Sequence, residues 1–264
     1  MATRRIQYGR ECFLAVSSSR VFKAPPSLMT HLRTLGISKI LKKTEKKSKE
    51  ASLEFCHLNI NGILDNNKFE YVHQLLLNSP NTILALTESH LYQDFPVQLV
   101  ELSGFKCYRK DRVGKKGGGV LLYVPDFIFS EQVEITINQQ SSVLEQLWVR
   151  CGIGTKIVLL ACLYRPPNIP HDQTRQSLIQ VEEILTRYPG ADRVLMGDLN
   201  IDISQGSYNR LKQDLLSFCE INQLSINDLD YTRIATRTWD DGTTTTSKTM
   251  IDVILCSPPG NYCH

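Results

Sequence analysis

The chain has 264 residues, of which 42% are hydrophobic and 22% are charged. This balance is typical of a protein that buries a core, and it excludes a collagen, a coiled coil or a disordered protein for the bulk of the chain. No apolar run approaches the roughly 18 residues that a membrane helix needs. The longest run, residues 157–164, has the length of a strand. The composition therefore predicts a soluble protein.

The net charge of +3 is unevenly distributed along the chain. Residues 1–50 hold 12 Lys+Arg against 3 Asp+Glu, a formal charge of +9, which leaves 18 against 24, or −6, for residues 51–264. The first segment has few aromatic residues and no sustained periodicity, which predicts a disordered basic tail followed by one domain. The lysines of residues 39–49 would suit a nuclear signal or a phosphate-binding arm, although a solvated charge run is the commoner outcome.

The eight cysteines include no CxxC pair. Four of them, Cys56, Cys151, Cys162 and Cys256, lie within apolar runs. Reduced thiols in the core of an intracellular protein are the favoured interpretation, ahead of a disulfide framework or a zinc site.

Short apolar runs alternate with amphipathic segments from residue 53 onward, which predicts strands mixed with helices. Asp65 is expected to cap a first helix, and Pro189 with Gly190 to end a second. Hairpins combined with helical crossovers predict an α+β fold, a four-layer α/β/β/α sandwich of two mostly antiparallel mixed sheets flanked by helices. The predicted strands are 53–58, 82–86, 104–109, 118–124, 132–137, 143–149, 156–164, 193–196 and 251–256, and the helices are centred on residues 69–76, 178–185 and 211–218.

Acidic and amide side chains recur where predicted strands end. Because strand ends converge on one rim in layered folds, these side chains are expected to share a site, and the spacing of two in GDLN places its Asp and Asn on one face of an extended segment. Oxygen ligands without Cys or His favour Mg²⁺ or Mn²⁺, and these ions complete their shell with substrate phosphate. Taken singly, each residue also fits a turn or a helix cap. The residues are Asn59 and Asn61 in LNING, Glu88 in LTESH, Asp198 and Asn200 in MGDLN, and Asp252 in MIDVIL.

The motifs LNING, LTESH, GGGVLLYV, CLYRPP, VLMGDLN and MIDVIL, in this order, resemble those of the endonuclease/exonuclease/phosphatase superfamily. More narrowly they resemble the apurinic-type endonuclease domain of non-LTR, LINE-like retrotransposons, which is fused upstream of a reverse transcriptase. The resemblance covers about residues 53–257. It implies a Mg²⁺-dependent (or Mn²⁺-dependent) hydrolase that nicks target DNA in the nucleus, with no membrane partner and no small-molecule cofactor.

The resemblance also implies roles for individual residues on the metal and substrate side. Glu88 matches the glutamate that binds the divalent ion, and Asn59 matches the asparagine at the metal and phosphate rim. Tyr164 matches a tyrosine whose phenol contacts the phosphate. Arg165 is expected beside it as a second substrate-binding charge, and Asn61 is a further substrate-binding candidate.

On the catalytic side, Asp198 matches the carboxylate that positions the attacking water, and Asn200 the amide that helps hold the transition state. Asp252 matches the aspartate that orients a catalytic histidine in a Ser-Asp-His motif. No Ser-Asp-His occurs in the sequence, and His264 is a poor substitute. The expectation is a truncated domain, 51–264, whose nuclease activity is impaired, because an acid-base partner contributes about 10²- to 10⁴-fold in rate.

Two other functions stay open at this stage: a catalytically silent nucleic-acid-binding or structural remnant, and a small-molecule phosphoesterase of the same fold.

The GKKGGG segment is interpreted as a hairpin connection, whose Lys115 and Lys116 would touch the DNA backbone. Either Thr232-Arg233 or Thr236-Arg237 resembles a Thr-Arg pair of the family. The histidines at 57, 73, 90 and 171 have no metal-ligand spacing and are interpreted as structural or solvent-facing.

Overall fold

The computed structural model describes residues 53–135, 142–204, 206, 208–226, 232–238 and 244–257. Outside the described residues lie the basic tail and His264, for which expectations were drawn from the sequence, and Trp239. The α-helices are α2 (Asn66–Asn78), α3 (His171–Thr186) and α4 (Arg210–Ile221), with a 3₁₀ turn, η1 (Val97–Leu99). The strands are β1 (Glu54–Asn59), β2 (Thr82–Thr87), β3 (Phe105–Lys110), β4 (Val120–Pro125), β5 (Phe129–Gln132), β6 (Glu145–Ile153), β7 (Lys156–Tyr164), β8 (Asp192–Asp198), β9 (Ser225–Ile226), β10 (Arg233–Thr238), β11 (Thr244–Thr249) and β12 (Asp252–Cys256).

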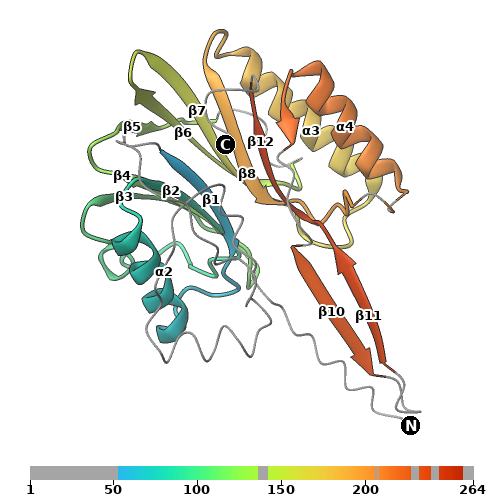
Figure 1. The fold of residues 1–264 in the computed structure, drawn as a ribbon, viewed down its shortest axis with the longest axis horizontal. Coiled ribbons are helices and arrows are strands. Elements are labelled where there is room, and N and C mark those ends of the chain that lie inside the picture. The colour runs from blue at the N-terminus through green and yellow to red at the C-terminus, as the bar shows by residue number, and fades with distance from the viewer. Residues whose placement is uncertain are drawn as a thin grey trace, which may run out of the picture.

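The first sheet has four strands in the order β1-β2-β4-β3, and helix α2 covers its outer face (Figure 1). Asp65 caps α2 as expected, because its carboxylate accepts hydrogen bonds from the main-chain N–H groups of Asn67 and Lys68. Val72 and Leu76 bury the inward face of the helix. The GKKGGG segment joins the antiparallel strands β3 and β4, which confirms that it is a hairpin connection.

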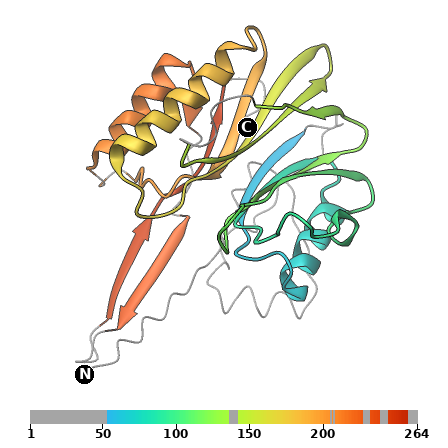
Figure 2. The ribbon, with the colours of Figure 1, turned by 180° about the vertical axis from the view of Figure 1, so that it is seen from behind.

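The second sheet has six strands in the order β5-β6-β7-β8-β12-β9. Helices α3 and α4 lie against its outer face, as both ribbon views show (Figures 1 and 2). Only β1–β2 and β7–β8 pair in parallel among the described strands, so both sheets are mixed and mostly antiparallel. The predicted α/β/β/α sandwich is therefore confirmed. Within the described residues, no helix is long and apolar enough to cross a membrane.

The inner faces of the two sheets enclose the central core. Because side chains alternate between faces along a strand, every second residue of β1, Phe55 and His57 among them, points toward the other sheet. The core between the sheets is almost entirely aliphatic and holds few polar groups, which makes each of them informative. Its members include Phe55, Ile83, Ala85, Val120, Leu122, Leu147, Val149, Val158, Leu160, Val194, Met196 and Ile254.

The strands differ from the expectation at two places. The strand expected over 132–137 is not found over its described residues: β5 ends at Gln132, one further bond joins the Val133 N–H to the Trp148 carbonyl of β6, and Val133 and Ile135 pack onto the core under α3 and α4. Residues 136 and 137 lie outside the described residues. The segment after β9 forms an unexpected hairpin, β10–β11, that extends away from the sandwich (Figure 1). The sequences of its strands, RIATRT and TTTSKT, are mostly polar and rich in Thr, so hydrophobic patterning does not reveal the hairpin.

The cysteines follow the expectation with one exception. Cys56, Cys151, Cys162 and Cys219 are buried free thiols, and Cys107 is a half-buried one. Burial raises the pKa of the Cys56 thiol to about 12, which keeps it unreactive. Cys256 is disulfide-bonded, so the expectation of a reduced thiol is wrong at that position.

We expect Gly197→Ala to destabilise the fold, because a Cβ at this position would lie 1.8 Å from the carbonyl oxygen of Leu163 on the neighbouring strand β7. Backbone cannot retreat as a flexible side chain can, so the free energy of unfolding should fall by about 3 kcal/mol or more. Gly152→Ala is the matched control, since its Cβ would meet Phe129 at an ordinary 3.7 Å. Urea unfolding of both variants tests this, and equal midpoints would contradict it.

Candidate active site

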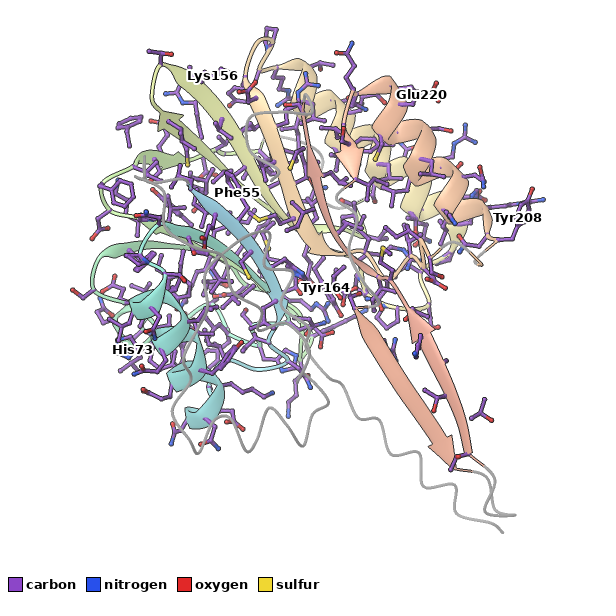
Figure 3. All side chains as sticks on the ribbon, viewed as in Figure 1. Phe55, His73, Lys156, Tyr164, Tyr208 and Glu220 are labelled. Carbon is purple, nitrogen blue, oxygen red and sulfur yellow. The ribbon has the colours of Figure 1, made fainter. Side chains whose placement is uncertain are left out.

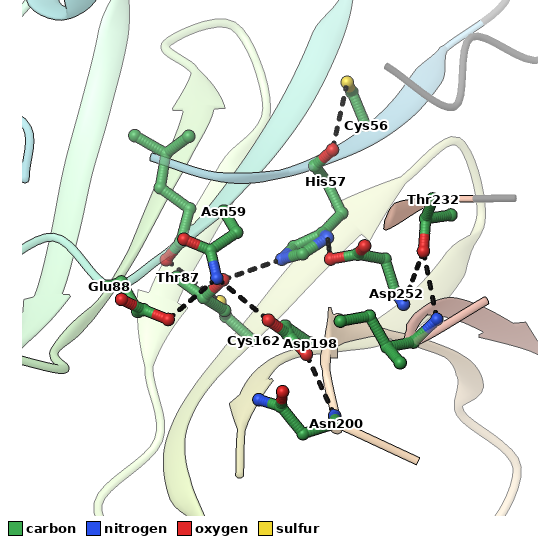
Figure 4. Close-up of polar contacts among 12 residues, drawn as sticks. Cys56, His57, Asn59, Thr87, Glu88, Cys162, Asp198, Asn200, Thr232 and Asp252 are labelled. Atoms are coloured by element: carbon green, nitrogen blue, oxygen red, sulfur yellow. Dashed lines mark hydrogen bonds and ion pairs between the residues drawn. The ribbon is translucent and has the colours of Figure 1, made fainter. Parts of the chain in front are cut away.

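Three side chains from separate strand ends meet at one end of the sandwich (Figure 4). Asn59 closes β1, Glu88 follows β2 and Asp198 closes β8. The Asn59 amide nitrogen donates to Glu88 Oε1 at 2.9 Å and to Asp198 Oδ2 at 2.8 Å. One neutral amide thus joins two carboxylates that belong to different sheets. The predicted convergence of strand ends is found, over a separation of 139 residues between Asn59 and Asp198.

Strand register brings two more predicted residues to the same place. Tyr164 on β7 pairs with Asp198, and Asp198 pairs on its other side with Asp252 of β12. Side chains at directly paired positions lie on the same face of a sheet. Tyr164, Asp198 and Asp252 therefore form a row across the inner face of the six-stranded sheet, opposite Asn59 and Glu88 of the other sheet.

The phenol of Tyr164 is part of the same network. Its hydroxyl donates to Glu88 Oε1 at 3.1 Å. Burial raises the pKa of this phenol, and the Glu88 carboxylate raises it further, so Tyr164 stays a neutral hydrogen-bond donor. In Figure 3 Tyr164 lies at the end of the sandwich from which hairpin β10–β11 extends.

Asp198 carries the most perturbed carboxyl of the site. It is 2% exposed. Burial raises its pKa to about 7, the nearby Asp252 carboxylate raises it as well, and the hydrogen bond from Asn59 opposes the rise. A carboxyl that titrates close to neutral pH beside a second carboxylate is typical of a catalytic or cation-binding site.

The main chain around the site is strained. Asn61, Glu88, His90 and Asn200 all have positive φ angles, between 45° and 56°, a region that residues other than glycine seldom adopt. Each of these residues lies within two or three positions of a strand end that supplies a site residue. Strain of this kind is typical of functional sites, where the surrounding structure holds an unfavourable conformation in place.

Asn200 and Asn61 lie at the edge of the site rather than at its centre. The Asn200 amide nitrogen donates to the carbonyl of Arg165, and its main-chain N–H donates to Asp198 Oδ1 at 2.9 Å. GDLN therefore forms a tight turn, and the extended segment expected from its spacing is wrong. Asn61 is exposed, and its N–H donates to Asn59 Oδ1. Their roles toward substrate stay predictions.

Arg165 has a different position from the one expected. It is 3% exposed, and its guanidinium donates to the carbonyls of Ile169 and Asn200 and to the hydroxyl of Thr174. Burial lowers the pKa of this guanidinium. These contacts tie the loop after β7 to the start of α3 and to the GDLN turn. They support a structural role and give no support to phosphate binding by Arg165.

The cation beside Tyr164 is instead Arg112, which sequence analysis did not identify. Its guanidinium carbon lies 5.7 Å from the centre of the Tyr164 ring, and its Nε pairs with Glu145. Gly118 makes this possible, because a Cβ there would lie 2.3 Å from the guanidinium. The glycine run thus serves to seat Arg112 beside the site.

Two further polar residues complete the surroundings of Asp252. His57 Nδ1 lies 3.3 Å from Asp252 Oδ1. The hydroxyl of Thr232 accepts hydrogen bonds from the N–H groups of Ile251 and Asp252 at 3.0 and 3.1 Å. Thr232 is buried and fixes the start of β12 at the base of the hairpin, which gives the first of the two Thr-Arg pairs a defined structural role.

The donor set fits a hard divalent cation. Glu88 and Asp198 are buried carboxylates held 2.9 and 2.8 Å from one amide nitrogen, and Asp252 adds a third carboxylate in the same row. Concentrated negative charge with oxygen ligands is what Mg²⁺ or Mn²⁺ requires, usually through one or two carboxylates plus substrate oxygens. Within the described segments, no group of three or more His, Cys, Asp or Glu residues is placed so that it could hold a metal ion, so Glu88, Asp198 and Asp252 do not act as three joint ligands. Asn59 directs its nitrogen to the carboxylates, so Glu88 is the stronger candidate ligand.

The sequence profile of the Endonuclease/Exonuclease/phosphatase family matches residues 56–261, more than three quarters of the chain. The chain belongs to this family. Membership implies metal-dependent phosphoesterase chemistry with a divalent cation, in agreement with the donor set described above. No curated protein matches the sequence.

Several solved structures share the fold of this family member at low sequence identity. The endonuclease domain of TRAS1, a telomere-specific non-LTR retrotransposon, is 12% identical with a TM-score of 0.54, over 77% of this chain and 84% of that one. TDP2 from Caenorhabditis elegans is 17% identical, with a TM-score of 0.53 over 89% and 72%. The mannosyl-6-phosphatase Bt3783 of Bacteroides thetaiotaomicron is 16% identical, with a TM-score of 0.53 over 79% and 86%. These similarities show a common architecture and no particular substrate.

The raised pKa of Asp198 predicts how the metal-free protein responds to pH. The folded state binds this proton more tightly than the unfolded state, so the stability it contributes is full below the ordinary pKa of about 3.9 and is lost as pH rises toward about 7. Asp198→Asn cannot titrate, and we expect its free energy of unfolding to fall less between pH 4 and pH 8, by roughly 1–3 kcal/mol.

Urea unfolding in EDTA across this pH range is the measurement. Asp94→Asn is the control, because Asp94 is exposed and the variant should follow the wild-type pH dependence. Parallel curves for the wild type and Asp198→Asn would contradict the assignment.

Proposed function

We propose that this protein is a Mg²⁺-dependent (or Mn²⁺-dependent) DNA endonuclease of the retrotransposon type, which nicks one strand of target DNA in the nucleus. The observation that carries the proposal is the amide of Asn59 joining the carboxylates of Glu88 and Asp198. The six ordered motifs that resemble LINE-like endonucleases support the choice of DNA as the substrate.

Each side chain has a role that its surroundings favour. Glu88, oriented by Asn59 and Tyr164, would hold the cation, which when bound polarises the phosphoryl oxygen and neutralises the phosphodiester. Asp198, with its pKa raised to about 7, is suited to accept a proton from the attacking water. The water oxygen forms a bond to phosphorus while one ester P–O bond breaks. The neutral phenol of Tyr164, which donates to Glu88 in the metal-free chain, would donate to a phosphate oxygen in its place when substrate is bound.

We propose that these 264 residues hydrolyse the phosphodiester slowly. The departing alkoxide needs a proton or an electrostatic partner, and the sequence has no Ser-Asp-His to supply an imidazole. A missing acid-base partner costs about 10²- to 10⁴-fold in rate. We therefore propose weak nicking activity rather than efficient turnover.

The hairpin favours a polymeric substrate over a small phosphoester. Strands β10 and β11 extend outward from the sandwich (Figure 2). Thr232 directly precedes β10 and is hydrogen-bonded to Asp252 of the site. The hairpin residues Thr244–Lys248 are exposed. Such an arm would lie along a nucleic acid that passes the site, whereas a small phosphoester would not reach it.

Supercoiled plasmid with Mg²⁺ tests the activity. We expect slow conversion to the nicked circle, abolished by EDTA and reduced at least 100-fold by Asp198→Ala and by Glu88→Gln, because the first removes the group that accepts the proton of the water and the second removes the charge that holds the cation. Asp94→Asn, an exposed change, should nick as the wild type does. Phosphate release from a sugar phosphate, assayed in parallel, distinguishes the small-molecule alternative. Nicking that survives Asp198→Ala would contradict the proposal.

The silent-binding alternative makes a different prediction about the basic tail. Replacing the six lysines of residues 39–49 by glutamine should lower DNA affinity and reduce the slope of log affinity against log salt, by up to about 0.9 for each phosphate that the tail no longer neutralises. If the protein is an enzyme, Mg²⁺-dependent nicking at low salt persists in this variant. If it only binds, affinity between 50 and 200 mM salt is largely abolished and shows no Mg²⁺ dependence.

A further inference from the structure

His57 connects the two sheets directly beneath the candidate site. It lies on β1, two residues before Asn59 and on the same face of the strand, and it is 3% exposed. Its Nε2 lies 3.1 Å from the hydroxyl of Thr87 on β2, and its Nδ1 lies 3.3 Å from Asp252 Oδ1 on β12 (Figure 4). One imidazole therefore touches both sheets.

Each partner of His57 is next to a site residue. Thr87 pairs in register with Asn59 and immediately precedes Glu88. Asp252 pairs in register with Asp198. A displacement of the imidazole would therefore act on the Glu88 side through Thr87 and on the Asp198 side through Asp252.

Packing alone does not require a histidine at this position. The surrounding inner faces of the sheets are aliphatic, with Ala85 beside His57 in the paired strand and Phe55 preceding it on the same face. A polar side chain buried in such a layer is costly unless its atoms find partners. Here Nε2 has a hydroxyl at hydrogen-bond distance, whereas Nδ1 lies at ion-pair distance from a carboxylate without a hydrogen bond, and both partners are at the rim of the site. From the family resemblance, Asp252 is expected to orient the histidine of a Ser-Asp-His motif. In this structure the Asp252 carboxylate lies next to His57.

We propose that His57 is a positioning residue for the site: through Thr87 and Asp252 it sets the distance between the sheets at which Asn59 joins Glu88 to Asp198. This inference rests on the proposed function for its consequence in catalysis, but the coupling itself is a property of the metal-free chain. His57 touches neither substrate nor cation in this role. Residues that hold a ligand in place in this way typically change metal affinity or activity by about 10- to 100-fold.

The test compares the full-length chain with His57→Leu, His57→Gln and Thr87→Val, with His73→Leu as the matched control on the outer helix α2 (Figure 3). Three readouts are needed: the side-chain amide resonances of Asn59 in ¹⁵N-asparagine-labelled protein, the dissociation constant for Mn²⁺ alone, and kcat and KM for plasmid nicking. Thermal unfolding reports whether each variant is folded. Asn59→Asp identifies the Asn59 amide signal by its loss.

We expect His57→Leu to move the Asn59 amide resonances, to weaken Mn²⁺ binding by about 10-fold or more and to lower kcat by about 10- to 100-fold, with KM within about threefold. Glutamine, which retains a donor and an acceptor, should restore part of each effect. His73→Leu should change none of them. A folded His57→Leu with wild-type Asn59 resonances and Mn²⁺ affinity would overturn the inference, as would an effect confined to KM.

Thr87→Val keeps the test decisive if His57→Leu does not fold, because it removes only the hydroxyl that contacts Nε2. It should shift the same Asn59 signals, and a folded Thr87→Val without that shift would overturn the inference. Failure of the proposed function has a different signature. A wild type that neither binds Mn²⁺ nor nicks DNA removes that function, whereas the response of Asn59 to changes at His57 would still show the coupling.

Discussion

The site depends on a neutral amide that holds two carboxylates of opposite sheets. Asn59 gives one N–H to Glu88 and the other to Asp198, so the two acids are fixed without any fixed positive charge between them. A lysine or arginine in the same place would neutralise the acids and remove the attraction for a cation. The amide instead orders the carboxylates and leaves their charge available. The same bonds join the four-stranded sheet to the six-stranded sheet, so the site adds a polar contact between the sheets to the aliphatic core that packs them together.

Much of the fold and the centre of the site could be predicted because both follow from local patterns. Apolar runs of strand length gave most of β1 to β8, and Asp65 marked the start of α2. Residues at the ends of such runs, Asn59, Glu88 and Asp198, could be expected to meet because layered sheets bring strand ends to one rim. The α/β/β/α order follows from the need to cover both faces of each sheet.

Two kinds of feature could not be predicted: the direction in which a side chain points, and contacts between residues that are far apart in the sequence. Arg165 follows Tyr164 in the sequence, but its side chain turns to main-chain carbonyls, and the cation near the phenol comes from Arg112, 52 positions earlier. His57 has the two-residue spacing from Asn59 that places it on the same strand face, yet its partner Asp252 is 195 residues away. The polar hairpin β10–β11 has no apolar pattern at all.

The row of paired positions on β7, β8 and β12 makes the site sensitive to changes in chain length. Because side chains alternate along a strand, one inserted or deleted residue in β8 would turn the carboxylate of Asp198 toward the helices and bring Gly197 or Leu199 to face Asn59. The outer hairpin is under no such restriction, since its strands pair only with each other and rejoin the sheet at Thr232 and Asp252. Natural variants should therefore differ in the length of the arm while the three strands keep theirs.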